Sequence, residues 1–538
     1  MNECFTGHKN CPDLASAILP TRVVDVGELD GSEPPRLLVT KGLHGQWLSL
    51  SHRWGDQKFL TTTSKNLADH IQCIPWLQLP KTFQDAIWVT RKLGFKYIWI
   101  DSLCILQDSK DDWITESSKM GDVYKNSILT FAAGHPESPK QGMLAERAPS
   151  LPQYSLPFPN PSFHIIQLSY RNATSGAVET VGVQKVPIGT YSSIIEENTL
   201  STRGWVVQET VLSPRTITWG QEGMTWQCRT CAGGEYERKV HMADDVNWKL
   251  TPGLHHFPKR ILRPTKASAG LFPYNCLPIW WLKLMEWVLR SFSSGDSLTP
   301  YDDWYRVLRL YFDCELTYKE DALVAIAGVA KEVELRTGDT YCAGLWRNDF
   351  CRGLLWYSNS LVDHVAPSIP SWSWASRKAR GNLYFMVPRP TNNDLTIIRV
   401  GKVEPARNDL DHIAEVVARG LTRVPPTDYT KNGLQKAFRK NEFYMPAQPE
   451  KETGQWLSYH MDLAGCLETS TEPGGRGLVF VDQVLCLSVG TNEKERFGIL
   501  IRLSKERQGA YQRIGCFRMD LKWESKFGPW KRQNVTMV

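Results

Sequence analysis

The chain has 538 residues, of which 42% are hydrophobic and 22% charged, and a net charge of +6 at pH 7. This composition is typical of a soluble globular protein and excludes a mainly disordered, collagenous or multi-span membrane chain. The small basic excess is spread along the chain, so we expect no nucleic-acid partner. Thirteen cysteines without an N-terminal apolar export segment indicate reduced thiols and a cytoplasmic location.

The first third of the chain alternates strands and helices. Apolar runs at 47–51 and 97–100 predict two buried strands. A helix from Pro80 to Gly94 is indicated by apolar residues at three- and four-residue steps and by the flanking proline and glycine. A second helix at about 111–124 and a third strand at 128–133 follow. This order predicts an α/β fold with a parallel sheet flanked by helices.

Polar and reactive side chains follow two of these strands directly. After the first strand come His52, Arg53, Trp54 and Gly55. After the second come Asp101, Ser102 and Cys104. Because ligands of open α/β sheets bind beyond the carboxyl ends of the strands, we expect both loops to face one crevice. Its nucleotide- or ligand-binding edge would then consist of Arg53, Trp54 and Gly55.

The middle of the chain has a different character. Residues 149–198 are rich in Pro, Ser and Asn, which indicates an insertion or a variable connection. The aromatic stretch 271–292 contains Lys283, Glu286 and Arg290 as well as two prolines, which a spanning helix tolerates poorly. We therefore expect no transmembrane segment, and we favour buried packing or a lid over contact with a membrane surface.

The end of the chain predicts a helical segment followed by a mostly β region. Residues 322–332 have the apolar spacing of a helix. From about residue 370 onward, apolar and polar residues mostly alternate, as they do in half-buried strands. The expected strands lie at 415–424, 477–487, 497–503 and 511–517, the last two forming a hairpin.

Several short sequence blocks follow one another in a particular order along the chain. The first are LSHRWG from Leu50, LTTTSKNL from Leu60, LPKTFQDAIWVTRKLGFKYIWIDSLCILQD from Leu79, and MGDVYKNSILTFAA from Met120; RGWVVQETVLSPRTITWG from Arg203 and WQC from Trp226 follow. In this order and spacing they resemble the fungal heterokaryon incompatibility (HET) domain family. The motif residues that the resemblance adds are Gln107, Asp108, Trp113, Arg203, Gly204, Trp205, Gln208 and Glu209.

The resemblance implies a division of the chain into four parts. An N-terminal extension would occupy residues 1–35, and the HET domain residues 36–235, with its variable insertion at about 149–198. An aromatic-rich linker and helical region would follow at 236–335. The mostly β remainder would be 336–538. DALVAIAGVA at 321–330, YCAGLW at 341–346 and PSWSWAS at 370–376 resemble the C-terminal extension of long family members.

The resemblance also implies a function. Members of the family act in non-self recognition between fusing fungal hyphae, where an activated HET domain triggers growth arrest and cell death through self-association or a protein partner. Others lie in gene clusters of secondary metabolism, so a tailoring enzyme with a small-molecule substrate is an alternative. HET domains are also remotely similar to Toll/interleukin-receptor (TIR) domains, some of which cleave NAD, which makes an NAD-cleaving enzyme a further alternative. A pseudo-enzyme scaffold is a third possibility.

Two chemical interpretations are open for the candidate catalytic residues. In one, Cys104 is a nucleophile with the His52 imidazole as its base, or Asp101 is a general base. In the other, Asp101 caps its loop and Cys104 is a small buried residue. For cleavage of a glycosidic bond, Glu116 is the candidate carboxylate, and its alternative is a solvated glutamate in the first turn of a helix.

The remaining polar motifs are ambiguous as well. Arg203 could hold a phosphate or form an ion pair that ties its helix to the core. Cys228 and Cys231 form one CxxC, and Cys4, His8 and Cys11 form a second small group. A zinc site made from both would need distant segments to meet, so we predict no metal site. No resident cofactor is implied, although NAD remains a candidate substrate.

Overall fold

The computed structural model divides the chain into two compact units, Met1–Thr299 and Pro300–Val538. The boundary falls inside the region 236–335 that we assigned to the linker and helical segment. The structure describes residues 1–13, 16–144, 165–171, 178–184, 199–220, 223–234, 241–242, 299–358, 369–378, 381, 383–385, 391–402, 413–423, 435–436, 442–446, 455–461, 467–469, 478–480, 484–526 and 529–538.

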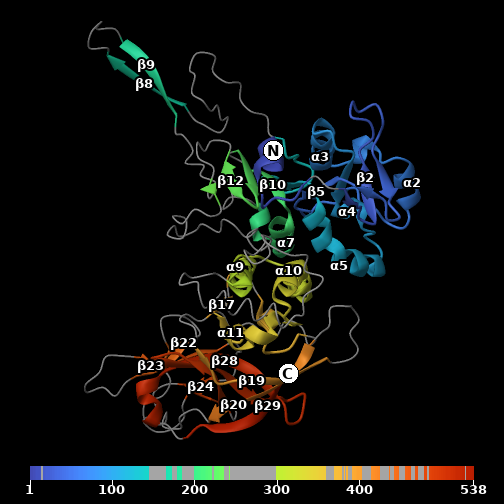
Figure 1. Cartoon of the computed structure of the whole chain (residues 1–538). Coiled ribbons are helices and arrows are strands. Elements are labelled where there is room, and N and C mark those ends of the chain that lie inside the picture. Colours follow the sequence, from blue (N-terminus) through green and yellow to red (C-terminus); the bar gives the residue numbers. More distant parts are fainter. Residues whose placement is uncertain are drawn as a thin grey trace. The chain divides into compact units, whose positions relative to one another are not determined.

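A nine-stranded mixed sheet forms the first unit (Figure 1). Its four central strands pair in parallel and are, in spatial order, β10 (Arg215–Trp219), β7 (Thr130–Ala133), β5 (Trp47–Ser51) and β6 (Tyr97–Ile100). Antiparallel strands extend both edges, which corrects the expectation of a parallel sheet. They are β2 (Arg22–Asp25) and β3 (Arg36–Val39) beside β6, and β11 (Met224–Cys228), β12 (Cys231–Gly234) and β13 (His241–Met242) beside β10.

Short connections explain why the edges run antiparallel. Only two residues separate β11 from β12, and a connection this short can join antiparallel strands but no parallel pair. At the opposite edge, β2 pairs antiparallel with both β3 and β6. Strand β2 lies within residues 1–35, so the segment that we assigned to an N-terminal extension contributes a strand to the main sheet.

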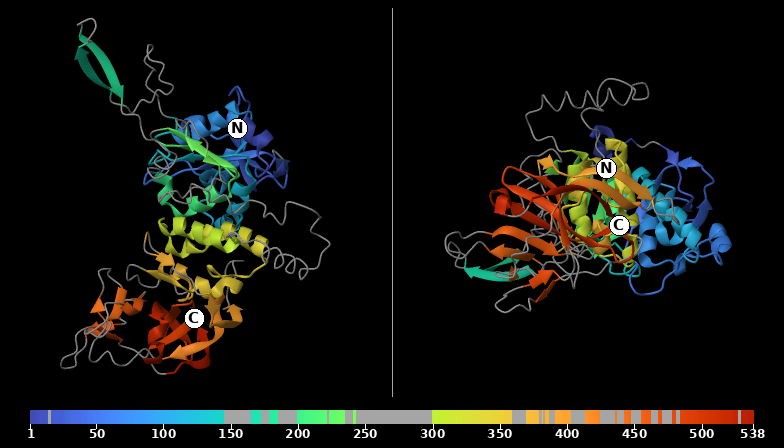
Figure 2. Two further views of the ribbon diagram at one scale, coloured as in Figure 1. Left: turned by 60° about the vertical axis from the view of Figure 1, so that its left-hand side comes forward. Right: turned by 90° about the horizontal axis from the view of Figure 1, so that it is seen from below.

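Helices of the first unit lie on both sides of its sheet (Figure 1). Helix α3 (Lys81–Lys92) lies on one side, and α5 (Lys110–Asn126) and α7 (Gly204–Leu212) lie on the other, as the view in Figure 2 also shows. Both helices expected in this region are present. Helix α3 begins after Pro80 and is followed by Gly94 with φ +80°, while Ser109 caps α5 by accepting the Asp112 N–H.

Tryptophan side chains lie in the core of each unit. In the first unit, the indole N–H of Trp47 donates to the Val123 carbonyl at 3.2 Å, and the Trp99 ring packs edge-on against Tyr124. Together these two strand residues hold α5 on the sheet. Among the residues that the structure describes, the fully buried tryptophans are Trp47, Trp99, Trp304, Trp346, Trp356, Trp372 and Trp374. These tryptophans therefore belong to the hydrophobic core, and their burial explains their presence without a ligand-stacking role.

The second unit contains helices followed by a mostly β region, as expected. Helices α9 (Pro300–Phe312) and α10 (Ala327–Thr337) precede a ten-stranded sheet. The predicted hairpin is confirmed, since β27 (Glu495–Leu503) and β28 (Tyr511–Asp520) pair antiparallel. Strands β20, β25 and β26 lie in the other two stretches expected to be extended, with bounds Ile413–Arg423, Leu478–Phe480 and Val484–Thr491.

The helix expected at 322–332 begins later than its sequence suggested. Two 3-10 turns, η6 (Lys319–Ala322) and η7 (Val324–Ile326), precede α10. Ala322, Ala325 and Ile326 are completely buried in these turns. Apolar spacing records which side chains are buried, but three-residue steps fit a 3-10 turn as well as an α-helix.

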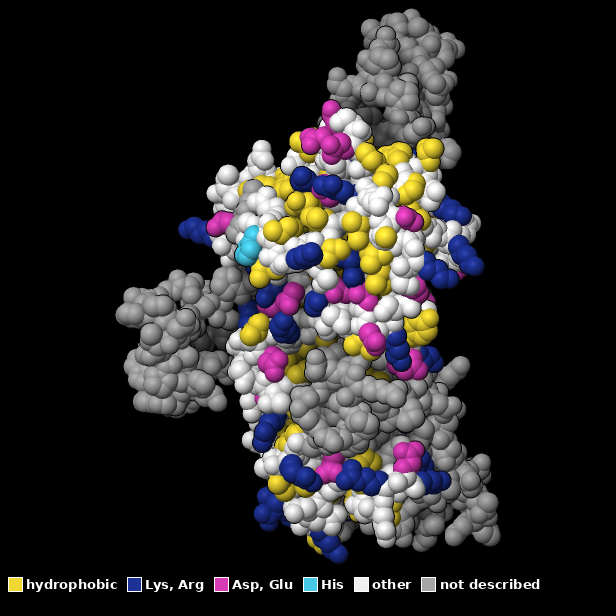
Figure 3. All heavy atoms as spheres, turned by 90° about the vertical axis from the view of Figure 1, so that its right-hand side faces the viewer, with side chains coloured by type: hydrophobic (Ala, Val, Ile, Leu, Met, Phe, Trp, Pro, Cys, Tyr) yellow, Lys and Arg dark blue, Asp and Glu magenta, His cyan; other side chains and the backbone are white. Residues whose placement is uncertain are grey.

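The surface of the first unit includes several exposed apolar side chains. Figure 3 shows hydrophobic side chains gathered on one face of this unit, with Lys and Arg side chains between them. Among the exposed ones are Leu77 on η1 (Trp76–Gln78) and Trp88 on α3, which are 93% and 49% exposed. No helix within the described residues has the length and apolar character needed to cross a membrane. The aromatic stretch 271–292 lies outside the described residues.

Within the expected insertion, two strands are described. Strands β8 (Ile165–Arg171) and β9 (Val178–Gln184) pair antiparallel with each other. They form a separate two-stranded sheet rather than additional strands of the main sheet. The central sheet therefore continues from β7 to β10 without a strand from the region between them.

Candidate functional site

Three segments that are distant in sequence meet beyond the carboxyl ends of β5 and β6. The Trp54 indole N–H donates to Asp101 Oδ2 at 2.9 Å, and the Arg203 guanidinium donates to the His52 carbonyl at 2.6 Å. Asp101 begins the short helix α4 (Asp101–Cys104), and Arg203 precedes α7. The two strand-end loops therefore lie together, and the segment at 203 joins them.

His52 is the buried centre of this group. Its Nδ1 lies 3.6 Å from Asp101 Oδ1, and its ring packs edge-on against Phe83 at 4.9 Å between centroids. Burial lowers the pKa of His52 to about 4, although the Asp101 charge opposes that shift. The imidazole is therefore neutral at physiological pH, and it offers a hydrogen-bonding group rather than a positive charge.

Glu209, on α7, is the second titratable group near these residues. Burial raises the pKa of Glu209 to about 7, while the Ser51 hydroxyl and the Arg203 charge oppose the increase. A carboxyl group that titrates near pH 7 can both donate and accept a proton under physiological conditions. We define the His52 cluster as His52, Trp54, Asp101, Arg203 and Glu209.

The proton-exchanging character of Glu209 was missed by the sequence analysis. Glu209 belongs to the RGWVVQE block and was therefore predicted to be a motif residue, but nothing local to that block indicates its burial. Its exposed fraction of 7% results from packing of α7 against the sheet and against α5. In the sequence, the burial of Glu209 is indicated only by its position among the apolar residues of WVVQETVL.

The loop after β5 is shaped by a glycine. Gly55 has φ +65°, and a Cβ built there would lie 2.9 Å from the Ser138 Cβ and 3.1 Å from the Glu137 carbonyl. Only glycine adopts this conformation in that space without strain. Arg53, in the same loop, is exposed, while Trp54 is half-buried. The loop thus holds Trp54 against Asp101 and leaves Arg53 accessible.

Cys104 lies inside α4 and is 1% exposed. Burial raises the pKa of the Cys104 thiol to about 12, so the thiol is protonated at neutral pH. Because the thiolate is the reactive form, this environment favours the interpretation of Cys104 as a small buried residue. Its carbonyl accepts a hydrogen bond from Arg22 Nε at 2.6 Å, and Arg22 also forms a two-pronged ion pair with Asp112 on α5.

Glu116 occupies a different place from the His52 cluster. Its carboxylate accepts hydrogen bonds from the Thr21 hydroxyl at 2.8 Å and from Lys119 Nζ at 3.1 Å. Glu116 is 3% exposed, so it is not the solvated first-turn residue of the alternative interpretation. These contacts join α5 to the segment before β2 and indicate a structural role.

The other motif residues position the loops around the cluster. The Gln107 side chain donates to the Asp101 carbonyl at 3.3 Å and to the Ile105 carbonyl at 2.9 Å. Asp108 accepts the Ser64 backbone N–H at 2.8 Å, which ties the loop after α4 to the loop before α2 (Leu67–Gln72). The rings of Trp113 and Trp205 meet edge-on, and Gly204 and Gln208 are buried in α7.

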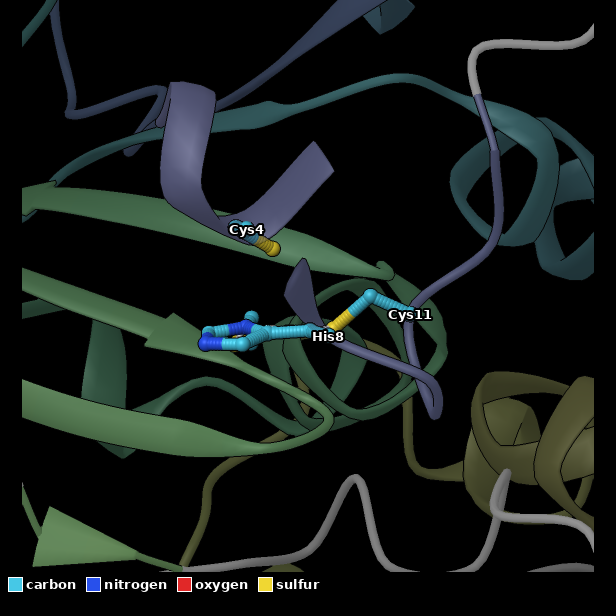
Figure 4. Close-up of side chains that lie close together, drawn as sticks. Cys4, His8 and Cys11 are labelled. Atoms are coloured by element: carbon cyan, nitrogen blue, oxygen red, sulfur yellow. Dashed lines mark hydrogen bonds between the residues drawn. The ribbon is translucent and has the colours of Figure 1, made fainter. Parts of the chain in front are cut away.

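A second polar group lies at the other edge of the sheet. Cys4, His8, Cys11 and Cys228 each have a donor atom within 4.8 Å of the donor atoms of the other three. We name these four residues the cysteine cluster. Figure 4 shows Cys4, His8 and Cys11 side by side. The N-terminal segment and the end of β11 therefore meet, although the sequence led us to predict no metal site.

The comparison with known families finds a match for part of the first unit. Residues 47–209 match the family described as Heterokaryon incompatibility protein (HET). This stretch is thus a heterokaryon incompatibility domain, as the resemblance of the sequence blocks predicted. No curated protein and no solved structure matches the chain. The matched residues include the whole His52 cluster, whereas every member of the cysteine cluster lies outside them.

Proposed function

We propose that this chain is an effector of fungal non-self recognition whose HET domain triggers growth arrest or cell death in the cytoplasm. The family match supports a role in heterokaryon incompatibility in the general sense. One structural observation supports the more specific proposal: the sequence blocks at 50–55, 101–108 and 203–209 converge on the His52 cluster. The second unit would restrain the domain or bind the protein partner that releases it.

Asp101 is the residue on which this cluster depends most. Its carboxylate accepts from Trp54 Nε1 and from the Ser102 backbone N–H, and its charge lies beside buried His52. In an Asp101→Ala variant the side chain is a methyl group, so the Trp54 N–H would lose its acceptor. The substitution would also remove the negative charge that faces His52 and Glu209. We therefore expect the domain to lose its toxic activity.

The test is inducible expression of the full chain in a filamentous fungus, with growth and viability as readouts. Wild-type protein is expected to arrest growth, and the Asp101→Ala variant to lose this effect at equal soluble abundance. Asp30→Ala is the matched control because Asp30 is an exposed carboxylate whose side chain contacts Ser32 in a surface loop. Undiminished killing by soluble Asp101→Ala protein would count against the proposal.

A second candidate function is enzymatic cleavage of NAD or a related nucleotide, with Glu209 as the acid–base carboxylate. The observation that favours it is the Glu209 pKa of about 7. In this reaction, the bond between ribose C1 and the nicotinamide nitrogen breaks, and nicotinamide leaves with the electron pair. Water forms the new bond to C1, and Glu209 accepts its proton.

The enzymatic function is tested by incubating the full chain with NAD and measuring nicotinamide release. Release that disappears in Glu209→Gln and persists in Glu116→Ala would support it. Release that depends on Glu116 would transfer the role to that residue, as the sequence first suggested. Soluble wild-type protein that releases no nicotinamide would exclude NAD as the substrate. The TIR-like fold and a role in secondary metabolism remain predictions from the resemblance.

A further inference from the structure

The cysteine cluster joins two segments that are far apart in the chain. Cys4 belongs to α1 (Asn2–Gly7), and His8 and Cys11 follow it directly. Cys228 ends β11 and begins the short turn to β12. Its Sγ lies 3.4 Å from His8 Nδ1, and the Cys11 Sγ lies 3.9 Å from the same nitrogen. Figure 4 shows the Cys11 sulfur directed toward the His8 side chain.

These separations match the edges of a zinc coordination tetrahedron. Zinc binds thiolate sulfur at about 2.3 Å and imidazole nitrogen at about 2.0–2.1 Å, so neighbouring donor atoms are about 3.5–3.8 Å apart. The two distances from His8 Nδ1 to sulfur, 3.4 Å for Cys228 and 3.9 Å for Cys11, are close to this spacing. Hydrogen bonding alone gives no reason for three thiols and an imidazole to gather in one buried place.

We propose that the chain binds one zinc ion through the thiolates of Cys4, Cys11 and Cys228 and the imidazole of His8. The three cysteines are 3%, 9% and 0% exposed, and His8 is half-buried. Four protein ligands fill the tetrahedron and leave no position for a substrate, which makes the site structural rather than catalytic. Zinc would fasten the N-terminal residues to the β11–β12 hairpin.

A buried arginine supplies the charge that such a site requires. Arg215, on β10, is 1% exposed, and its Nε donates to the Cys4 Sγ at 3.2 Å. Its other hydrogen bonds within the described residues go to the Pro12 and Ile128 carbonyls, and its guanidinium lies over the Phe5 ring. A buried cation that contacts only neutral groups is costly, and a Cys4 thiolate provides the missing negative partner.

The same charge argument identifies the fourth ligand. Three thiolates and one neutral imidazole give a zinc site a net charge of −1, which the Arg215 guanidinium neutralises. Cys231 is also close, with its Sγ 3.6 Å from that of Cys228. If Cys231 replaced His8, four thiolates would leave one uncompensated negative charge beside Arg215. Burial penalises such a charge, so His8 is the better fourth ligand.

Backbone groups around Cys228 are arranged to support a thiolate. The N–H groups of Thr230 and Cys231 both point at the Cys228 Sγ, at 3.4 and 3.3 Å. Such outer hydrogen bonds orient metal-binding thiolates and stabilise their charge. Cys231 therefore contributes its backbone N–H to the site, while its thiol packs beside it.

The first experiment measures metal content in the full chain. Protein purified without chelator and passed over a desalting column is expected to contain one zinc per chain by elemental analysis. Cys228→Ser and His8→Ala should lose the bound zinc. Cys73→Ser is the matched control, since Cys73 is a half-exposed thiol that follows α2. Wild-type protein that contains no zinc and takes up none from a zinc buffer would overturn the proposal.

A second experiment does not depend on the ligand variants folding. Wild-type protein is stripped with chelator and loaded with Co²⁺, whose visible absorption is intense in a tetrahedral site and weak in an octahedral one. We expect the intense spectrum, together with thiolate-to-cobalt charge transfer in the near ultraviolet and its loss on addition of Zn²⁺. A weak octahedral spectrum without charge transfer would overturn the site.

The identity of the fourth ligand is tested separately. Cys231→Ser should keep its zinc and the tetrahedral cobalt spectrum, because its thiol is not coordinated. Loss of zinc in Cys231→Ser together with retention in His8→Ala would overturn the assignment of His8. Titration of free thiols in denaturant provides a further test: a Cys228–Cys231 disulfide in the purified protein would remove two reactive thiols and contradict the zinc site.

Discussion

The two polar clusters of the first unit have different origins and, we expect, different consequences when they are lost. The His52 cluster lies beyond the carboxyl ends of parallel strands and within the residues that match the HET family. The cysteine cluster lies at the antiparallel edge and outside those residues. This comparison suggests that the first cluster carries the activity of the domain, while the second holds the N-terminal segment on the sheet.

The largest effect is expected from metal removal, which acts on the cysteine cluster alone. Chelation should lower the free energy of unfolding of the first unit by about 3 kcal/mol or more, a fraction of the roughly 10–16 kcal/mol reported for zinc-finger peptides. Denaturant unfolding with and without chelator, followed by tryptophan fluorescence, measures the loss. Restoration by added Zn²⁺ controls for other effects of the chelator. Unchanged unfolding would mean that the cysteine cluster does not hold the N-terminal segment.

The second effect is a pH dependence of stability that comes from the His52 cluster. The Glu209 pKa of about 7 lies above the ordinary glutamate value of 4.5. Between these values the folded state retains a proton that the unfolded state has released, so stability falls as pH rises from about 4.5 to 7 and is constant above. The free energy lost is about 3 kcal/mol, from about 1.4 kcal/mol per pKa unit.

His52 acts with the opposite sign over part of this range. Its pKa falls from 6.5 to about 4, so the unfolded state binds a proton that the folded state does not, and stability rises with pH between these values. The two slopes partly cancel in the wild type. Glu209→Gln should therefore become more stable relative to wild type between pH 5 and pH 8, as urea unfolding can measure. A constant difference between the two proteins would show that Glu209 ionises normally.

A third, smaller effect is expected from the loop that positions Trp54. Gly55→Ala introduces a Cβ at positive φ and 2.9 Å from the Ser138 Cβ. We expect a loss of about 2 kcal/mol in stability, since a left-handed residue costs about 1–2 kcal/mol before any steric conflict. Gly94→Ala is a matched control, because Gly94 also has positive φ but meets nothing within 4 Å. Equal losses of stability in both variants would mean that the Ser138 side chain leaves room for a Cβ at position 55.

The smallest stability change should accompany the largest loss of function. Asp101→Asn keeps an oxygen acceptor for the Trp54 N–H but removes the charge beside His52. We expect a stability change of about 1 kcal/mol, typical of one hydrogen bond, and complete loss of toxicity. Thermal unfolding and the growth assay measure the two quantities. A toxic Asp101→Asn protein would remove the functional distinction between the two clusters.

Local patterns were sufficient for most regular elements of the first unit. The strand at 97–100 is a short apolar run that fits a position buried on both faces, and the helix after Pro80 had both its start and its stop signals. The meeting of His52 and Asp101 followed from a general property of parallel strands, because their carboxyl ends lie at one edge. Local sequence patterns and one topological rule thus placed three of the five residues of the His52 cluster, namely His52, Trp54 and Asp101.

Other features depended on contacts between distant segments. Whether Glu209 ionises depends on how deeply α7 packs against the sheet, and α10 begins where buried 3-10 turns end rather than where its apolar spacing begins. The antiparallel edges of the sheet were also not predicted, because spacing along the chain does not determine which strands become neighbours. These properties arise from burial, which sequence periodicity indicates but does not measure.

The sequence by itself determined the family of the domain, its strand and helix order, and the residues that follow the ends of its strands. These depend on short-range propensities and on side-chain patterns that are present in the linear chain. Tertiary structure alone decided that Glu209 titrates near neutral pH and that Cys4 and Cys228 share one buried place. The first outcome depends on desolvation and the second on proximity, and both exist only after segments that are distant in the chain have packed together.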